Sequence, residues 1–400
     1  MKKVLLSLLL ILMLLTSCDL AMKNAPEVEP KIYFVGIGLD YKTWNRNNVG
    51  IAVSALDNTE NDLKAITAQF RQLAIDAGYE YRFVTYDDFA SASYGSETDK
   101  KYQYRFMFNS YTGKNGKDVE DESLQYVYKN IAHTNQDGTP NEVKLYDFAE
   151  DFSSALNDRI TNGGTETPTA DDIMIFYYTG HGIENGLGPA IYYQTGLEPN
   201  RLDEELMLPC ASEESQKANG ENYIIPIPYL YLDKYVFSEY RDSTIITLFD
   251  CCYSGYAIDN SDLGSIENFK TNAFDRVRDD KREVPSINSI FTNTYNATFG
   301  DSPANKNIYH LTAAHATQVS FDKDMDSKRP NQGAYGAFTY QVLSYLDYDF
   351  DNNRAGNHRK KVYSINEMYA HVYNNISYDT KTYATPNVTR SRFDYAIFMM

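Results

Sequence analysis

Continuous apolar runs, rather than alternating ones, mark the strands that the sequence predicts. Residues 173–178 (IMIFYY) and 245–249 (IITLF) are almost entirely apolar or aromatic, and each run is too short for a typical helix. Strands of this kind are buried on both faces, as in a parallel sheet covered by helices. Further strands are predicted at 32–39, 79–86, 308–314 and 392–400.

Helical periodicity occupies the stretches between these runs. Residues 58–77 place Ala65, Ile66, Phe70 and Leu73 at helical spacing. Strands that alternate with helices predict the α/β class, with a mostly parallel sheet and helices outside it. Two weakly periodic, polar stretches, 87–142 and 183–222, are interpreted as insertions, and the first of them is expected outside the core sheet. Other helices are predicted at 146–160, 226–235, 333–346 and 365–376.

The N-terminus has the pattern of an export signal. Lys2 and Lys3 precede an apolar stretch at 4–15, and Leu-Thr-Ser leads into Cys18. This resembles a bacterial lipoprotein signal, which implies removal of 1–17, lipidation of Cys18 and a short tether at 18–30. An ordinary cleaved signal is the alternative. No later apolar run reaches the ~18–20 residues that span a bilayer, so we expect an exported chain held in the cell envelope by lipid.

The net charge of the chain indicates which classes of binding partner it suits. The chain has 400 residues and a net charge of −18. Such an acidic protein is poorly suited to bind nucleic acid or an anionic membrane surface, and it suits basic substrates or cations. The four cysteines are too few and too irregularly spaced for a disulfide framework.

Two of the predicted strands end in chemically reactive residues. The run 173–178 leads to His181 and Gly182, and 245–249 leads to Cys252. Carboxyl ends of neighbouring parallel strands meet at one edge of a sheet. An imidazole can deprotonate a thiol there and later protonate a leaving group, and the N–H groups of Gly182 and Cys252 can hold a developing oxyanion.

These motifs resemble those of a known family. YYTGHG at 177–182 and DCCYSG at 250–255 are similar to the paired signatures of caspase-like cysteine peptidases (clan CD), in particular the metacaspase and bacterial branch. The resemblance implies a three-layer α/β/α sandwich over 31–400 and a Cys-His dyad that needs no cofactor. It also implies that Cys252, two residues after Asp250, is the nucleophile rather than Cys251. Further similar segments follow in the family's order at 310–322, 336–346 and 384–388.

The resemblance also implies a substrate preference. Asp250 would line the primary specificity pocket and pair with a substrate Arg or Lys. Thr179 stands where the family often has Ser, and Tyr253 stands where it usually has His, so both can reshape the pocket. Asp40, by its position after the first strand, is a candidate second carboxylate, although a plain loop acid is an equal alternative. The expected activity is that of an endopeptidase cleaving protein or peptide substrates with basic residues.

A basic run follows the nucleophile. It is either a solvated loop or a self-cleavage segment, placed like the inter-subunit linker of caspases. Its residues are Lys270, Arg276, Arg278, Lys281 and Arg282.

Two acidic stretches alternate as calcium loops do, Asp322-Asp324-Asp326 and Asp347-Asp349-Asp351. Neither has the Gly and Glu of an EF-hand, so a looser Ca²⁺ site stays open as an alternative. His310 and His315 are interpreted as structural residues. Two alternatives to the peptidase also stay open: a non-catalytic surface lipoprotein that binds a partner through the same scaffold, and the same dyad with specificity for Asp or Asn.

Overall fold

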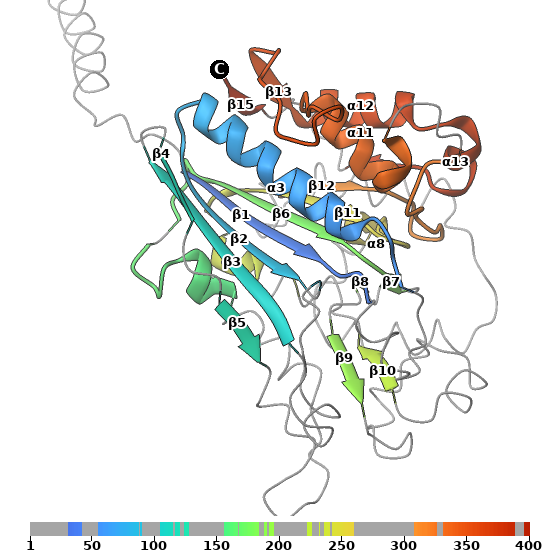
Figure 1. The fold of residues 1–400 in the computed structure, drawn as a ribbon, viewed down its shortest axis with the longest axis horizontal. Coiled ribbons are helices and arrows are strands. Elements are labelled where there is room, and N and C mark those ends of the chain that lie inside the picture. Colours follow the sequence, from blue (N-terminus) through green and yellow to red (C-terminus); the bar gives the residue numbers. More distant parts are fainter. Residues whose placement is uncertain are drawn as a thin grey trace, which may run out of the picture. The chain divides into compact units, whose positions relative to one another are not determined.

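Parallel strands form the middle of a nine-stranded sheet (Figure 1). At its centre, β1 (Lys31–Gly38) lies between β2 (Glu80–Asp87) and β6 (Ile173–Thr179). Beyond β6 come β11 (Thr244–Asp250) and β12 (Ile308–Thr312), again parallel. All five were predicted, and the mostly parallel α/β sheet is confirmed.

The computed structural model describes most of the sheet and the helices around it. Residues 1–30, which include the predicted signal and Cys18, lie outside the described part. So do the basic residues between 270 and 282 and Asp326. The described residues are 31–41, 55–87, 89, 105–114, 117–120, 124–127, 156–166, 168–183, 188–189, 192–195, 222–225, 232, 236–240, 242–259, 308–325, 331–388 and 396–400.

The expectation that 87–142 lies wholly outside the core sheet is wrong. β3 (Arg105–Lys114) pairs antiparallel with β2, and β4 (Lys117–Glu120) and β5 (Leu124–Val127) pair with β3. A strand at a sheet edge is held by backbone hydrogen bonds and needs no continuous apolar run, which explains the weak sequence signal. At the opposite edge β14 (Asn387–Val388) pairs antiparallel with β12.

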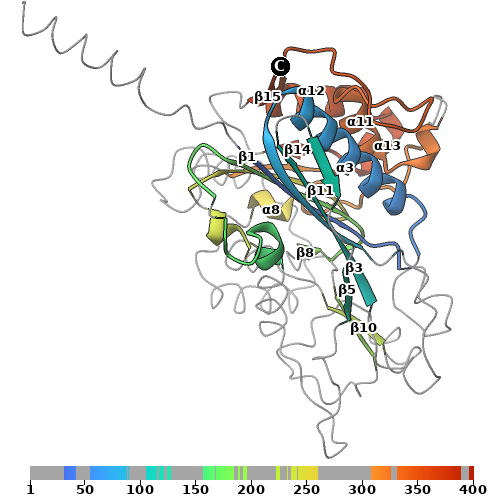
Figure 2. The ribbon, with the colours of Figure 1, turned by 60° about the vertical axis from the view of Figure 1, so that its left-hand side comes forward.

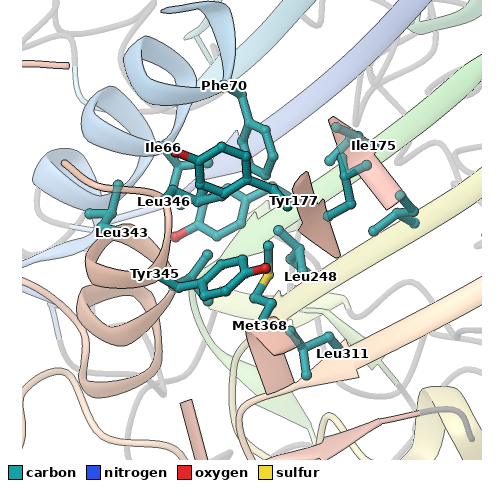
Figure 3. Close-up of a cluster of buried hydrophobic side chains, with 14 of the residues drawn as sticks. Ile66, Phe70, Ile175, Tyr177, Leu248, Leu311, Leu343, Tyr345, Leu346 and Met368 are labelled. Carbon is teal, nitrogen blue, oxygen red and sulfur yellow. The ribbon is translucent and has the colours of Figure 1, made fainter. Parts of the chain in front are cut away.

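Four helices cover one face of the sheet, as Figures 1 and 2 show. They are α3 (Thr59–Asp76), α11 (Ala337–Tyr345), α12 (Ile365–Asn375) and α13 (Tyr378–Tyr383). The apolar sides of α3, α11 and α12 meet the sheet in one hydrophobic layer (Figure 3), where Phe70, Leu343 and Met368 approach Tyr177 and Leu248. Burial of such side chains is the main stabilising contribution to a fold of this kind.

The other face of the sheet carries a second layer. It includes helical residues 156–160, the 3-10 helix η2 (Phe237–Tyr240) and α8 (Tyr256–Asp259). Phe176 of β6 meets Phe237 edge-on with ring centroids 5.3 Å apart. Because Tyr177 faces the helices of the first layer and Phe176 faces η2, β6 is buried on both sides, and the three-layer α/β/α arrangement is confirmed.

Small strand pairs lie beside the main sheet. β7 (Gly182–Ile183) pairs with β8 (Gly188–Pro189), and β9 (Tyr192–Thr195) pairs with β10 (Asn222–Ile225). The predicted terminal strand exists as β15 (Ala396–Met399), and it pairs with β13 (Val362–Ser364) rather than with the central sheet. A short 3-10 turn, η4 (Gln332–Ala334), precedes α11. Within the described part, no helix combines the length and the apolar character that a bilayer crossing requires.

The order of the strands determines where a site can form. From β1 the chain passes to β2 on one side and later returns to β6, β11 and β12 on the other. The strand order therefore reverses between β1 and β6. Open α/β sheets bind ligands in the crevice at the carboxyl ends of strands beside such a reversal.

Candidate active site

The two motifs, 177–182 and 250–255, each end in a loop that follows β6 or β11, and these two loops are called the signature loops. They leave neighbouring strands in register. Asp250, the last residue of β11, pairs with Thr179, the last residue of β6. Cys252 and His181 each follow two residues later, so the register of the sheet brings both loops to the same edge. The N–H of Gly180 donates to the carbonyl oxygen of Asp250 at 3.3 Å and joins the loops just beyond the strands.

Gly182 lies directly against the loop that carries the candidate nucleophile. A Cβ at this position would overlap the carbonyl oxygen of Cys252 and would lie 3.1 Å from Sγ of Cys251. Real Cβ atoms do not make such contacts, so the two loops approach this closely only because residue 182 is glycine. Cys251 itself is buried, whereas Cys252 is partly exposed.

The thiol of Cys252 is surrounded by backbone donors. The N–H of Ser320 donates to Sγ at 3.3 Å, and Sγ lies 3.9 Å from the carbonyl oxygen of Ser320. Burial raises the pKa of the Cys252 thiol, and the charge of Asp250 adds to that rise. The N–H groups of Ser320, Cys252 and Gly182 act in the opposite direction. Two of these groups, the N–H of Gly182 and the N–H of Cys252, are the ones predicted to hold an oxyanion.

Asp250 points into the helical layer rather than into solvent. Its Oδ2 accepts from the Thr339 hydroxyl at 2.7 Å and from the Thr339 N–H at 3.2 Å, and its Oδ1 accepts from the Ser320 hydroxyl at 3.0 Å. Burial raises the pKa of Asp250 to about 6 despite these hydrogen bonds, and the charge of Asp322 contributes to the rise. A buried carboxyl in such a setting gains from a cationic partner.

Asp62 is a second buried carboxyl at the same place. It lies in the first turn of α3, accepts from the Gly336 N–H at 3.0 Å and from the Thr179 hydroxyl at 3.4 Å. Burial raises the pKa of Asp62 well above its ordinary value, and the charge of Asp250 is the next cause. Among the described residues, no Lys or Arg forms an ion pair with Asp62 or Asp250.

From the sequence, Asp40 is a candidate second carboxylate with a plain loop acid as an equal alternative, and Asp62 has no assigned role. Asp40 is buried after β1, and its carbonyl oxygen accepts from the Leu56 N–H at 2.9 Å. Its charge adds to the effect of burial on Asp87, whose pKa rises to about 6, so the electrostatic influence of Asp40 reaches the end of β2. The carboxyl whose pKa the charge of Asp250 raises is that of Asp62.

Thr339, Ser320 and Gly336 were also missed. Thr339 and Asp62 are each a polar residue in the first turn of an observed helix, α11 and α3 respectively. First turns of helices that follow parallel strands lie at the carboxyl edge of the sheet, so polar residues there are candidates for a site. Gly336 acts through its backbone N–H, and Ser320 acts through its backbone N–H and its hydroxyl from a segment outside the predicted helices.

Several carboxylates of the acidic stretches that suggested calcium loops accept hydrogen bonds from other parts of the protein. Asp322 accepts from the N–H groups of Asp57 and Asn58, and Asp324 accepts from Thr380 at 2.7 Å. Asp349 accepts from Asn352. In the described ranges, no group of three or more His, Cys, Asp or Glu side chains is arranged to hold a metal ion. Whether Ca²⁺ affects the protein stays a prediction.

His310 and His315 make contacts that support the fold around β12. His310 pairs through Nδ1 with the Thr247 hydroxyl at 2.7 Å, and burial lowers the pKa of His310 to about 4. His315 precedes the turn that packs on Gly255. Their contacts fit the structural role expected for both.

Comparison with known proteins finds similarity to solved structures and none to family models or curated sequences. No family model matches the chain, and no curated protein sequence matches it. Among solved structures, a protein from Geobacter sulfurreducens is similar over 93% of this chain and 97% of its own, with a TM-score of 0.34 and 14% identity. A secreted C11 cysteine protease from Bacteroides thetaiotaomicron, iotapain, is similar over 90% of this chain and 66% of its own, with a TM-score of 0.36 and 14% identity. Likenesses of this size do not establish a function or a family for the chain.

Proposed function

We propose that this chain is a cysteine endopeptidase that cleaves peptide bonds after Arg or Lys. The observation that carries the proposal is the pair of buried carboxyls, Asp62 and Asp250, the second of which lies two residues before Cys252. Their raised pKa values mean that each carboxylate is costly in the free protein, and a guanidinium or ammonium group bound between them removes that cost. A basic substrate side chain supplies such a group.

The chemistry follows from the loops at the strand ends. His181 takes the proton of the Cys252 thiol as sulfur attacks the scissile carbonyl carbon. The oxyanion forms near the N–H groups of Gly182 and Cys252. His181 then protonates the leaving amine, the C–N bond breaks, and a thioester remains. Water attacks the thioester, with His181 again as base, and releases the carboxylic acid and the free thiol.

The raised pKa of Cys252 supports a thiol that is neutral before substrate binds. The charge of Asp250 is one cause of that rise. A substrate cation paired with Asp250 removes part of that negative potential and favours the thiolate. Binding of the correct side chain thereby makes the nucleophile more reactive, which suits a peptidase selective for basic residues.

The experiment is hydrolysis of peptide-amide reporters that differ only in the residue before the amide: Arg, Lys, Leu, Asn or Asp. The full-length protein is expected to cleave the Arg and Lys reporters, and Cys252→Ala is expected to abolish this cleavage. Cys251→Ala is the matched control because it removes the adjacent, buried thiol and leaves the attacking one. Undiminished cleavage by Cys252→Ala, or preference for Asp or Asn, would contradict the proposal.

The proposal includes export and attachment to a membrane through a lipid on Cys18. Its support is the sequence of the first 18 residues alone. Cys18→Ser is expected to move the protein from the membrane fraction of cells to the soluble fraction. Self-cleavage among Lys270, Arg276, Arg278, Lys281 and Arg282 is the proposed activation step, and a protein that cleaves Arg reporters while remaining a single band would contradict it.

A further inference from the structure

Two buried tyrosines hold the backbone of His181. The His181 N–H donates to the Tyr41 phenol oxygen at 2.9 Å, and the Tyr178 hydroxyl donates to the His181 carbonyl oxygen at 2.7 Å. The two phenol oxygens lie 3.1 Å apart. Both polar backbone groups of His181 are therefore bound by buried side chains, one from the end of β6, the strand that precedes it, and one from the residue that follows β1 by three positions.

The proton positions follow from these contacts. A phenol has one proton, and that of Tyr178 is directed at the His181 carbonyl oxygen. Between the two phenols Tyr41 is therefore the donor. The His181 N–H, the Tyr41 hydroxyl and the Tyr178 hydroxyl then form a closed ring of hydrogen bonds that returns to His181.

The conformation of Tyr41 is unusual for its residue type. Its φ of 58° lies in the left-handed region, which is strained for a bulky side chain. The side chain is fully buried, and its ring centroid lies 4.8 Å from that of the His181 imidazole. Backbone strain of this kind persists where surrounding contacts impose it, and it clusters at functional sites.

The ring of hydrogen bonds also requires the glycine between its members. A Cβ at Gly180 would lie 2.5 Å from the Tyr178 phenol oxygen and 2.9 Å from that of Tyr41. Tyr41 follows β1 and Tyr178 belongs to β6, the two strands between which the strand order reverses. The ring therefore ties His181 to the ends of both strands.

We propose that Tyr41 is a positioning residue for His181. It anchors the His181 backbone through its hydroxyl and packs against the imidazole with its ring, so that the base keeps one orientation toward Cys252. Tyr178 completes the anchor. The inference rests on the proposed peptidase function, and it assigns Tyr41 no contact with reacting atoms.

Tyr41→Phe in the full-length protein tests the inference, because it keeps the aromatic ring and removes the hydroxyl. We expect kcat on an Arg-amide reporter to fall about 10- to 100-fold with KM within about twofold, since a misplaced catalytic group costs rate rather than binding. Tyr178→Phe is expected to behave alike, and the double variant to be little worse than either one. Tyr240→Phe is the matched control: it removes a buried hydroxyl that donates to Asn157 at 3.0 Å, in the opposite layer, and is expected to leave kcat unchanged.

A second measurement, hydrogen exchange of the His181 amide, tests the hydrogen bond to Tyr41 without substrate. In protein labelled with ¹⁵N-histidine, the His181 amide signal is assigned by its loss in His181→Ala, and Tyr41→Phe is expected to speed its hydrogen exchange at least about tenfold. Unchanged exchange, or faster exchange with unchanged kcat, would overturn the inference. A wild-type protein that cleaves no reporter overturns the proposed function instead, so the two failures are distinguishable.

Discussion

The carboxyls of Asp62 and Asp250 converge on Gly336 from two adjacent layers of the fold, the helical layer and the sheet. A Cβ at Gly336 would lie 2.9 Å from Oδ2 of Asp62 and 2.6 Å from Oδ2 of Asp250. Asp62 lies in the first turn of α3, whereas Asp250 ends β11. Two acids that share one buried place repel each other, and this repulsion is the physical basis of the proposed preference for basic substrates.

The carboxyl pair predicts how substitution changes specificity. Asp62→Asn and Asp250→Asn are each expected to lower kcat/KM for an Arg reporter by about 2–5 kcal/mol, roughly 30- to 4,000-fold, because a buried cation loses one anionic partner. The exposed Asp351→Asn is the control and is expected to have no effect. An equal loss on a Leu reporter would indicate damage to the fold rather than to specificity.

Asp250 also predicts a dependence of stability on pH. Its folded pKa of about 6 lies above its ordinary value of 3.8, so the folded protein holds this proton more tightly than the unfolded chain. The stabilisation from Asp250 is complete below about pH 4 and is lost as pH rises through 6, by an amount on the order of 2–3 kcal/mol. Urea unfolding at stepped pH should show this as the difference between wild type and Asp250→Asn. A difference that is constant with pH would contradict the assignment.

His310 is expected to change the pH dependence of stability in the direction opposite to Asp250. Burial lowers its pKa from 6.5 to about 4, so the unfolded chain binds the proton more tightly. Its contribution to the free energy of unfolding is present above pH 6.5 and is lost as pH falls toward 4. Relative to wild type, His310→Gln should therefore gain stability on acidification, measured by the same urea titrations. Because Asp250 and His310 oppose each other in one pH range, only the variants separate them.

Gly182 predicts a steric effect at the junction of the two signature loops. Gly182→Ala places a methyl group on the carbonyl oxygen of Cys252, which must push the loops apart. We expect a loss of about 1–3 kcal/mol in the free energy of unfolding and at least about 100-fold in kcat. Gly333→Ala is the matched control, since a Cβ there has nothing within 4 Å. Retained activity in Gly182→Ala would mean that the loops need not be so close.

The strands that carry the signature loops could be predicted from the sequence because their signal is local. Residues of β6 and β11 are buried on both faces, and burial on both faces requires a continuous apolar run. His181 and Cys252 could also be found from the sequence, because each lies in the loop directly after such an apolar run. β3 could not be found this way because an edge strand relies on backbone pairing with β2.

The partners within the site were decided by the tertiary structure alone. Asp62 and Gly336 are hydrogen-bonded across 274 positions of sequence, and Tyr41 and His181 across 140. Which acid faces Asp250, and which tyrosine holds the histidine, depends on the strand order and on how α3 and α11 pack over the sheet. The sequence by itself determined where the reactive residues stand along the strands; only the packing of distant segments determined what surrounds them, because a local pattern records burial and not the identity of the neighbour.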